Sequence, residues 1–198
     1  MPRFPYRHCL FWNFGHILKD SGLWITAHCG AVLTACCTWW SAAPLHLAAA
    51  TAAAACYDRA TTEAVLAKAR GVADCIAEAN HMGTAFGPVN VAIHAISTSL
   101  RLGDPRTATE IGEALDIAAM PVGLVGRRTQ VNLDLARAYA MCRKDAAAVN
   151  LLLAAERLSP QLFRCDQATR DVLTELLRRE HRPSTPELRP LAHRAGVI

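Results

Sequence analysis

The sequence predicts an all-α protein, and three observations support this prediction. Helix-forming residues dominate the 198-residue chain, with a large excess of alanine and leucine. No stretch alternates β-branched and polar residues between turn signals, as a half-buried strand would. Glycine and proline breaks recur at short intervals and separate stretches with a helical period. A chain of this length is sufficient for one domain with a proper core.

The breaks divide most of the chain into helices joined by short connections. We expect helices near residues 43–57, 61–80, 88–102, 106–119, 123–143, 146–158, 167–181 and 185–195. Pro88, Pro105 and Pro186 suit the first turn of a helix, where no backbone donor is missed. The other breaks are Gly83, Gly87, Gly103 with Asp104, Pro121 with Gly123, Ser159 with Pro160, and Arg182 with Pro183.

Residues 1–40 differ in composition from the rest of the chain and predict an atypical N-terminal segment. They hold most of the phenylalanine and tryptophan of the chain and show no sustained helical period. Residues 22–57 carry no charge, which is long enough for a membrane span or part of a signal sequence. Pro44, His46 and the weak hydrophobicity of alanine argue against both. We therefore expect a cytoplasmic protein with one helical domain over residues 41–198.

Charge and cysteine spacing argue against two common functions. The net charge of +4 is modest and scattered, which does not provide the basic stripe of a nucleic-acid-binding protein. The eight cysteines form no C-x-x-C pair, and the adjacent Cys36 and Cys37 cannot place two thiolates on one tetrahedral metal without strain. We therefore interpret the cysteines as small apolar core residues in a reducing compartment, and we expect no metal and no cofactor.

A tetratricopeptide-like repeat of about 34 positions fits the chain when it begins at Thr129. Its signature positions are occupied by Leu135, Ala136, Tyr139, Ala148, Leu152, Ala155 and Pro160. Asn132 replaces the opening tryptophan of the pattern. Two degenerate copies lie upstream, and in one of them Gly112 stands where a large side chain is usual. The favoured architecture is therefore a tetratricopeptide-like helical-hairpin solenoid, with a plain helical bundle as the alternative.

Three segments of the chain resemble a family of bacterial transcriptional regulators. They are "TAFGPVNVAIHAISTSLRLGD" (84–104), "RRTQVNLDLARAYAMCRKDAAAVNLLLAAERLSP" (127–160) and "LRPLAHRAGV" (188–197). In that family a helix-turn-helix of the xenobiotic-response-element (XRE) type is joined to a tetratricopeptide-like regulatory domain. The resemblance covers about residues 41–198. It implies a domain that senses a protein, peptide or small-molecule effector and is not an enzyme, and a homodimer is compatible with it.

The chain departs from that family because no DNA-binding domain is recognised before the repeats. Residues 1–40 are too short and too irregular for a compact helix-turn-helix bundle. Residues 188–197 resemble the first helix and turn of such a motif, and we expect no recognition helix in this chain. We therefore expect no specific nucleic-acid binding by this chain alone. A truncated or shifted reading frame and a stand-alone regulator explain the N-terminal composition equally well.

The helix predicted from Pro88 onward has two distinct sides. The side predicted to be buried carries Val89, Ala92, Ile93, Ile96 and Leu100 at helical spacing. The opposite side carries Asn90, His94, Ser97 and Arg101, and the next first helix adds Gln130 and Arg137. Because the first helices of such repeats face the concave side, these six side chains predict a groove for a partner or ligand. A solvated face and a set of hydrogen bonds between helices are the alternatives.

The sequence predicts no catalytic residues. His94 has no serine, cysteine or carboxylate partner at a motif spacing, and the chain has neither a phosphate-binding glycine loop nor a His-x-x-x-His pair. The leading function is therefore a regulatory or protein-interaction module. Two alternatives stay open: an intact DNA-binding regulator, and a helical adaptor tethered to a membrane by residues 22–40.

Overall fold

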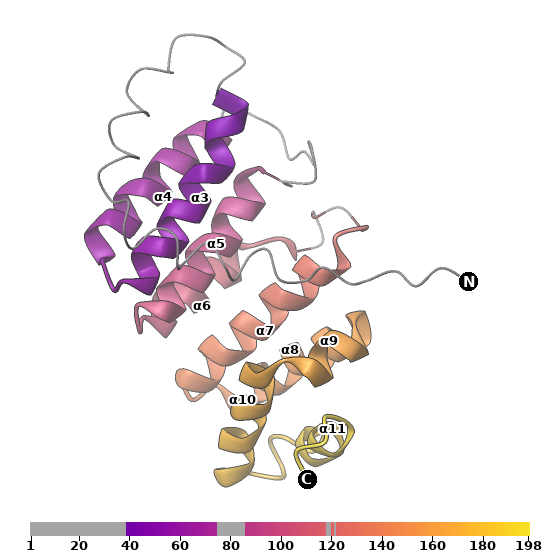
Figure 1. Ribbon diagram of the computed structural model, residues 1–198. Coiled ribbons are helices and arrows are strands. Elements are labelled where there is room, and N and C mark those ends of the chain that lie inside the picture. The colour runs from indigo at the N-terminus through magenta and orange to yellow at the C-terminus, as the bar shows by residue number, and fades with distance from the viewer. Residues whose placement is uncertain (1–38, 75–85, 118–119, 121) are drawn as a thin grey trace.

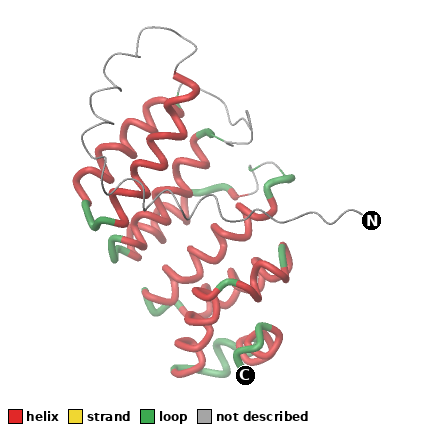
Figure 2. The backbone as a smooth tube through the Cα atoms, in the orientation of Figure 1, coloured by secondary structure: helices red, strands yellow, loops and turns green. Residues whose placement is uncertain are grey.

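The computed structural model describes residues 39–74, 86–117, 120 and 122–198. The regular elements in these residues are all helices, with no strand among them (Figures 1 and 2). The all-α prediction is therefore confirmed. The helices are α3 (Trp39–Ala55), α4 (Arg59–Ala73), α5 (Pro88–Arg101), α6 (Pro105–Ala114), α7 (Val125–Met141), α8 (Asp145–Leu158), α9 (Pro160–Cys165), α10 (Gln167–Arg178) and α11 (Leu188–Arg194).

The helices follow one another along the molecule, mostly as packed pairs (Figure 1). α3 packs on α4, α5 on α6 and α7 on α8, and the partners are joined by residues 56–58, 102–104 and 142–144. The first helices also contact one another, α3 with α5 and α5 with α7. α7 further contacts α9 and α10, and α10 contacts α11. The order in space therefore follows the order in sequence, and α5 and α7 lie in the middle of the row.

The three connections between paired helices share one backbone conformation. In each, one residue has a positive φ: Tyr57 at 59°, Gly103 at 74° and Arg143 at 63°. The amide of the following residue donates to the carbonyl five residues earlier, which is the 6→1 bond of a Schellman motif. This motif ends the first helix and directs the chain back along it. The same turn therefore produces three similar helix pairs.

Gly103→Ala should lower the free energy of unfolding by about 1 kcal/mol, because alanine tolerates the left-handed conformation poorly. A Cβ at this position would meet no atom within 4 Å, so the effect comes from the backbone alone. Arg143→Gly in the equivalent turn should instead raise it by about 0.5 kcal/mol, since the strain relieved exceeds the entropy that glycine adds to the unfolded chain. Urea denaturation measures both changes. Effects of the same sign would contradict the shared conformation.

Aspartate and proline residues define the starts of several helices. Asp58, Asp104 and Asp166 precede α4, α6 and α10, and each side chain accepts a hydrogen bond from the backbone amide three residues later. These bonds satisfy donors that a helix leaves unpaired in its first turn. Pro88 and Pro105 occupy the first turns of α5 and α6, as the sequence predicts.

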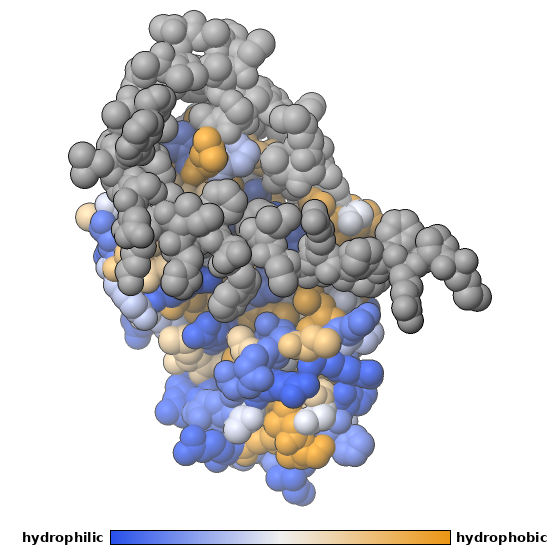
Figure 3. Space-filling view, in the orientation of Figure 1, coloured by the Kyte–Doolittle hydropathy of each residue, from blue (hydrophilic) through white to orange (hydrophobic). Residues whose placement is uncertain are grey.

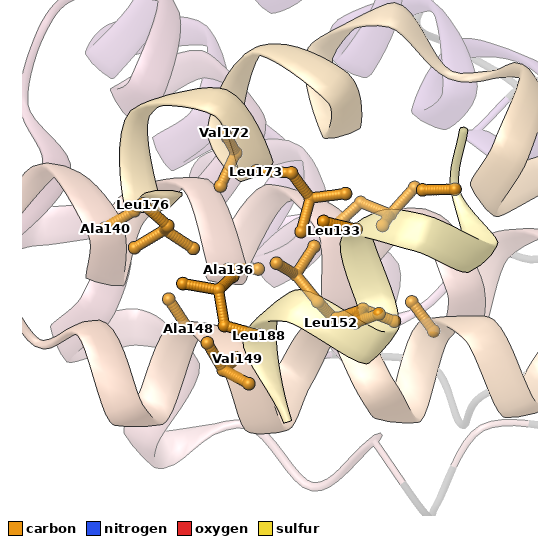
Figure 4. Close-up of a cluster of buried hydrophobic side chains, with 14 of the residues drawn as sticks. Leu133, Ala136, Ala140, Ala148, Val149, Leu152, Val172, Leu173, Leu176 and Leu188 are labelled. Carbon is orange, nitrogen blue, oxygen red and sulfur yellow. The ribbon is translucent and has the colours of Figure 1, made fainter. Parts of the chain in front are cut away.

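Three buried apolar clusters connect neighbouring helix pairs. The first lies between α3, α4 and α5 and includes Leu66 and Val91. The second lies between α5, α6 and α7, around Ile96 and Leu135. The third joins α7 to α8, α9, α10 and α11, and Figure 4 shows its side chains, such as Leu173, converging from several helices. Because α5 and α7 each contribute to two clusters, they couple one pair to the next.

The observed helices differ from the predicted ones mainly at their ends. The sequence does not predict α9, because Ser159 and Pro160 are also a normal helix stop, yet Pro160 begins this helix. α11 begins at Leu188, so the prediction that Pro186 lies in its first turn is wrong. α4 and α6 end at Ala73 and Ala114, earlier than predicted. The remainders of these two predicted helices include residues 75–80 and 118–119, outside the described residues.

The interpretation of the cysteines as core residues is wrong for two of them. Cys56 and Cys165 are exposed, while Cys142 is partly buried. Cys56 follows the last residue of α3 and Cys165 is the last residue of α9, and helix ends project beyond the packed faces. A small apolar side chain is therefore not buried merely because it belongs to an apolar stretch. Outside the described residues lie Cys9, Cys29, Cys36, Cys37 and Cys75.

The predicted N-terminal segment and the proposed tether in residues 22–40 fall almost wholly outside the described residues, which begin at Trp39. Among the helices that the structure describes, none combines the length and the apolar character needed to cross a bilayer. The visible surface of the C-terminal half is mostly hydrophilic, with apolar groups gathered near α11 (Figure 3).

Candidate functional site

α5 has apolar neighbours on two sides, which corrects the predicted division of this helix. Ile93, Ile96 and Leu100 are buried in the cluster shared with α6 and α7, as predicted. Val91 and Ala95 are also buried, in the cluster shared with α3 and α4. Since α5 stands between two helix pairs, only a narrow strip of its surface remains for polar groups. A one-sided amphipathic pattern underestimates burial in such a helix.

Asn90 is only 4% exposed, so the prediction that it lies open in a groove is wrong. Its side-chain oxygen accepts a hydrogen bond from Nη1 of Arg127 on α7. Asn90 is in the first turn of α5, directly after the Gly87 and Pro88 break. Because the bond joins two first helices, Asn90 helps to hold α5 against α7.

His94 lies one turn after Asn90 and is partly buried. Its Nδ1 is 3.4 Å from Oγ1 of Thr51 on α3, and that hydroxyl donates to the carbonyl of Leu47. Since the hydroxyl has one proton and directs it to Leu47, we assign the ring proton of neutral His94 to Nδ1, on the side of Thr51. Burial, and secondly the positive charge of Arg127, lower the pKa of His94 from 6.5 to about 4. The ring is therefore neutral at pH 7.

The other predicted groove residues are less buried. Ser97 is partly buried, and Arg101, Gln130 and Arg137 are exposed. Nε2 of Gln130 donates to Oδ1 of Asp134 over 3.2 Å. Burial raises the pKa of Asp134 from 3.8 to about 6, against the opposing effects of that hydrogen bond and of the charges of Arg137 and Arg101. α5 and α7 thus place two guanidinium groups near one carboxyl group.

Three polar residues of this surface are absent from the sequence prediction: Thr51, Arg127 and Asp134. Arg127, Gln130, Asp134 and Arg137 follow one another on one face of α7, so helical spacing would have found the two on α7. Thr51 gives no such signal, because its contact with His94 depends on how α3 packs against α5. We call the combined set the first-helix strip: Thr51, Asn90, His94, Ser97, Arg101, Arg127, Gln130, Asp134 and Arg137.

The first-helix strip has two chemically different ends. At one end, Arg127 supplies a positive charge beside the polar groups of Asn90 and His94. At the other end, about 10 Å away along α7, Asp134 is near both Arg101 and Arg137. Within the described residues, no group of three or more His, Cys, Asp or Glu side chains is placed to hold a metal ion. The chemistry that the strip offers is hydrogen bonding and charge pairing.

Asp134→Asn should raise the melting temperature at pH 7 and leave it unchanged near pH 4. The folded-state pKa of about 6 exceeds the ordinary value of 3.8, so the folded protein binds this proton more tightly than the unfolded chain does. The partly buried carboxylate is therefore destabilising only above about pH 4, where the unfolded chain is ionised, by at most about 1–2 kcal/mol after screening by solvent. Thermal melts from pH 4 to pH 7.5 measure the difference. A gain that is independent of pH would contradict this assignment.

Comparison with protein-family models, with curated proteins and with solved structures found no match for this chain. The resemblance to XRE-type regulators therefore rests on the three quoted segments. The polar and charged groups of the first-helix strip provide a basis for proposing a function that does not depend on this resemblance.

Proposed function

We propose that this chain is a cytoplasmic regulatory domain that senses a protein, peptide or small-molecule effector, and that the effector binds on the first-helix strip. The contacts of His94 with Thr51 and of Arg127 with Asn90 carry the proposal. They place polar groups from three successive first helices side by side, next to the exposed Gln130. Such convergent polar groups orient ligands in binding sites. The chain is then a binding module and not an enzyme.

The proposed architecture is a tetratricopeptide-like solenoid. Its support is the shared turn of three helix pairs and the contact of each first helix with the next. In the best-fitting repeat, Ala136, Ala148 and Ala155 are fully buried, as close packing of two helices requires. The deviating Gly112 also has a packing explanation, because a Cβ there would collide with the Leu135 side chain. A row of this kind presents its first helices on one face.

The proposed relation is to the sensing half of XRE-type regulators. Its support is that the three resembling segments coincide with elements that make or sustain the first-helix strip. Residues 84–104 contain α5, residues 127–160 contain most of α7 and all of α8, and residues 188–197 contain α11. α8 and α11 share the apolar cluster under α7 and thereby hold that helix in place.

An effector found by thermal-shift screening should bind to the first helices. The full chain is screened against small metabolites and pooled synthetic peptides, and the Kd of each hit is measured by calorimetry. Replacing Gln130 and Arg137 together by alanine should weaken binding at least about tenfold, since a hydrogen bond to a charged group contributes about 1.5–3 kcal/mol. Both side chains are exposed, so stability should change by no more than about 0.5 kcal/mol for each.

Arg106 and Glu110, exposed on the second helix α6, provide the matched control. Their double alanine variant should bind the same hit with an unchanged Kd. A screen without any hit would contradict the proposal. So would a hit that is lost in the α6 variant and kept in the α7 variant.

DNA should not be bound with sequence preference by this chain. A helix-turn-helix reads bases through a recognition helix, whereas the net charge of +4 is scattered and gives only weak, salt-sensitive attraction to phosphates. Fluorescence anisotropy with random and selected duplexes at physiological salt measures the preference. Specific binders typically exceed random sequence by about 10³ or more, and a preference of that size would restore the DNA-binding regulator.

A further inference from the structure

We propose that the cationic end of the first-helix strip, formed by Arg127 with Asn90 and His94, binds a carboxylate group of the effector. The inference rests on the proposed sensing function and adds the chemical class of the group that is recognised. Its starting point is the guanidinium of Arg127, which is held between two first helices by a neutral partner.

Arg127 is partly buried, and it takes part in none of the ion pairs formed within the described residues. Its Nη1 donates instead to the amide oxygen of Asn90. Arg179 is also partly buried, but it forms two hydrogen bonds with the carboxylate of Asp145. A charge that is withdrawn from water without a counterion is unfavourable. An anion that binds from outside would therefore complete the surroundings of Arg127.

The nearest acidic residue of the same helix face does not fill this role. Asp134 lies seven residues after Arg127, about 10 Å along the axis of α7. Its carboxyl group is associated with Gln130, Arg137 and Arg101 at the other end of the strip. The cationic end is therefore distinct from the mixed end, and the positive charge of Arg127 is not cancelled along α7.

The charge at this end favours a carboxylate over a phosphate. His94 is neutral at pH 7, so Arg127 supplies the full positive charge of the group, which matches a singly charged anion. A phosphate monoester carries up to two negative charges at this pH and normally needs a cluster of cations. The planar guanidinium also matches the two oxygens of a carboxylate. Asn90 orients that plane from α5.

His94 determines which chemical group of the ligand is favoured next to its carboxylate. With the ring proton assigned to Nδ1, Nε2 of neutral His94 carries a lone pair, which gives it the capacity to accept a hydrogen bond from a ligand. The matching ligand has an N–H or O–H group close to its carboxylate. Both the C-terminal residue of a peptide and a small hydroxy acid have this chemistry, and the test distinguishes these two sources.

The test compares ligands that differ only in the carboxylate. The full chain is melted with sodium lactate, a random hexapeptide pool with free C-termini, the same pool with amidated C-termini, sodium phosphate, and sodium chloride, all at equal ionic strength. A carboxylate ligand at ten times its Kd should raise the melting temperature by about 3–6 °C. We expect this rise with the free-acid pool or with lactate, and none with the amidated pool or chloride. A larger rise with phosphate would overturn the carboxylate assignment.

Three substitutions, one of them a control, locate the carboxylate-dependent rise in melting temperature. Arg127→Met should abolish the carboxylate-dependent rise, whereas Arg106→Met on α6 should retain it. Asn90→Asp is nearly isosteric and places a carboxylate beside Arg127 within the chain, so it should fold and also lose the rise. Circular dichroism checks the fold of each variant. A rise that persists in Asn90→Asp would overturn the proposal even if Arg127→Met fails to fold.

The failure of this inference is distinguishable from that of the proposed function. If binding of a hit is weakened by the Gln130 and Arg137 substitutions but not by amidation or Asn90→Asp, the carboxylate site is wrong and the sensing face stands. If neither set of changes affects binding, both are wrong.

Discussion

Phe163→Ala should lower the free energy of unfolding by about 3–5 kcal/mol, the largest loss that we expect from one substitution in the described part of the chain. Phe163 is fully buried, and its short helix α9 joins the cluster shared by α7, α8, α10 and α11. Removing the ring leaves a cavity that we expect to stay open, because α7, α8, α10 and α11 are packed against one another around it. Urea denaturation measures the change. Gln161→Ala, at an exposed position of the same helix, should change stability by no more than about 0.5 kcal/mol.

Hydrogen exchange of Phe163→Ala should further separate a solenoid from a plain bundle. In a row of helix pairs, each pair is coupled mainly to its neighbours, so destabilisation should decrease with distance along the row. Amides of α8 and α10 should then lose more protection than those of α3 and α4, which belong to a different cluster. Equal loss of protection in all helices would indicate one cooperative core and favour the bundle.

The described helices are predictable from the sequence where their ends have side-chain signals. Pro105 and the capping Asp104 indicate the start of α6, and Gly103 is the left-handed residue of the preceding turn. Tyr57 and Arg143 adopt that same conformation without being glycine. The common conformation of the three turns therefore cannot be predicted from their residue types. α9 is missed for a related reason, because proline both follows helices and begins them.

The candidate site is predictable as a surface but not as a set of contacts. Periodicity places His94 and Arg101 on one side of α5, and it places Gln130 with Arg137 on one face of α7. It cannot show that α5 is packed on two sides and that Asn90 is consequently buried. The contact of Asn90 with Arg127 joins residues 37 positions apart. Such pairs depend on the packing of whole helices.

The burial of Asn90 changes the effect on stability that we expect from replacing polar residues of the first-helix strip. A joint alanine replacement of Asn90, His94 and Arg101 would be nearly neutral if all three were exposed. Because Asn90 is buried and bonded to Arg127, its loss leaves a partly buried guanidinium without that acceptor. Exposed Gln130 and Arg137 are therefore better probes of binding.

The second large effect should come from Arg179→Met, which should lower the free energy of unfolding by about 2–3 kcal/mol. Arg179 follows α10 and connects it to the start of α8 and the end of α7. Its Nε and Nη2 donate to the two carboxylate oxygens of Asp145 over 3.1 and 2.8 Å. The same Nη2 donates to the carbonyl of Ala140, near the end of α7. Glu175 accepts from Nη1 over 3.1 Å.

Among the ion pairs of the described residues, this pair is the one in which both side chains are less than 30% exposed. The side chains of Arg179 and Asp145 are 17% and 27% exposed, whereas Arg178 is 77% exposed in its pair with Glu175. Water screens the exposed pair strongly, and such pairs contribute only about 0–1 kcal/mol. The partly buried pair has two parallel hydrogen bonds, a geometry that makes arginine and carboxylate groups bind strongly. Arg178→Met is therefore the adjacent control and should be nearly neutral.

A double-mutant cycle separates the pair from the packing of the arginine stem. Arg179→Met keeps most of the apolar stem, so its effect should arise from lost hydrogen bonds and from the carboxylate of Asp145 that remains unpaired. If so, Arg179→Met and Asp145→Ala together should cost clearly less than the sum of the two single changes, with a coupling of about 1–2 kcal/mol. Additive effects in urea denaturation would show that the two residues stabilise the junction of α7, α8 and α10 independently. The coupling would instead show that one bidentate ion pair holds the end of α10 on the start of α8, the helix that packs against α7.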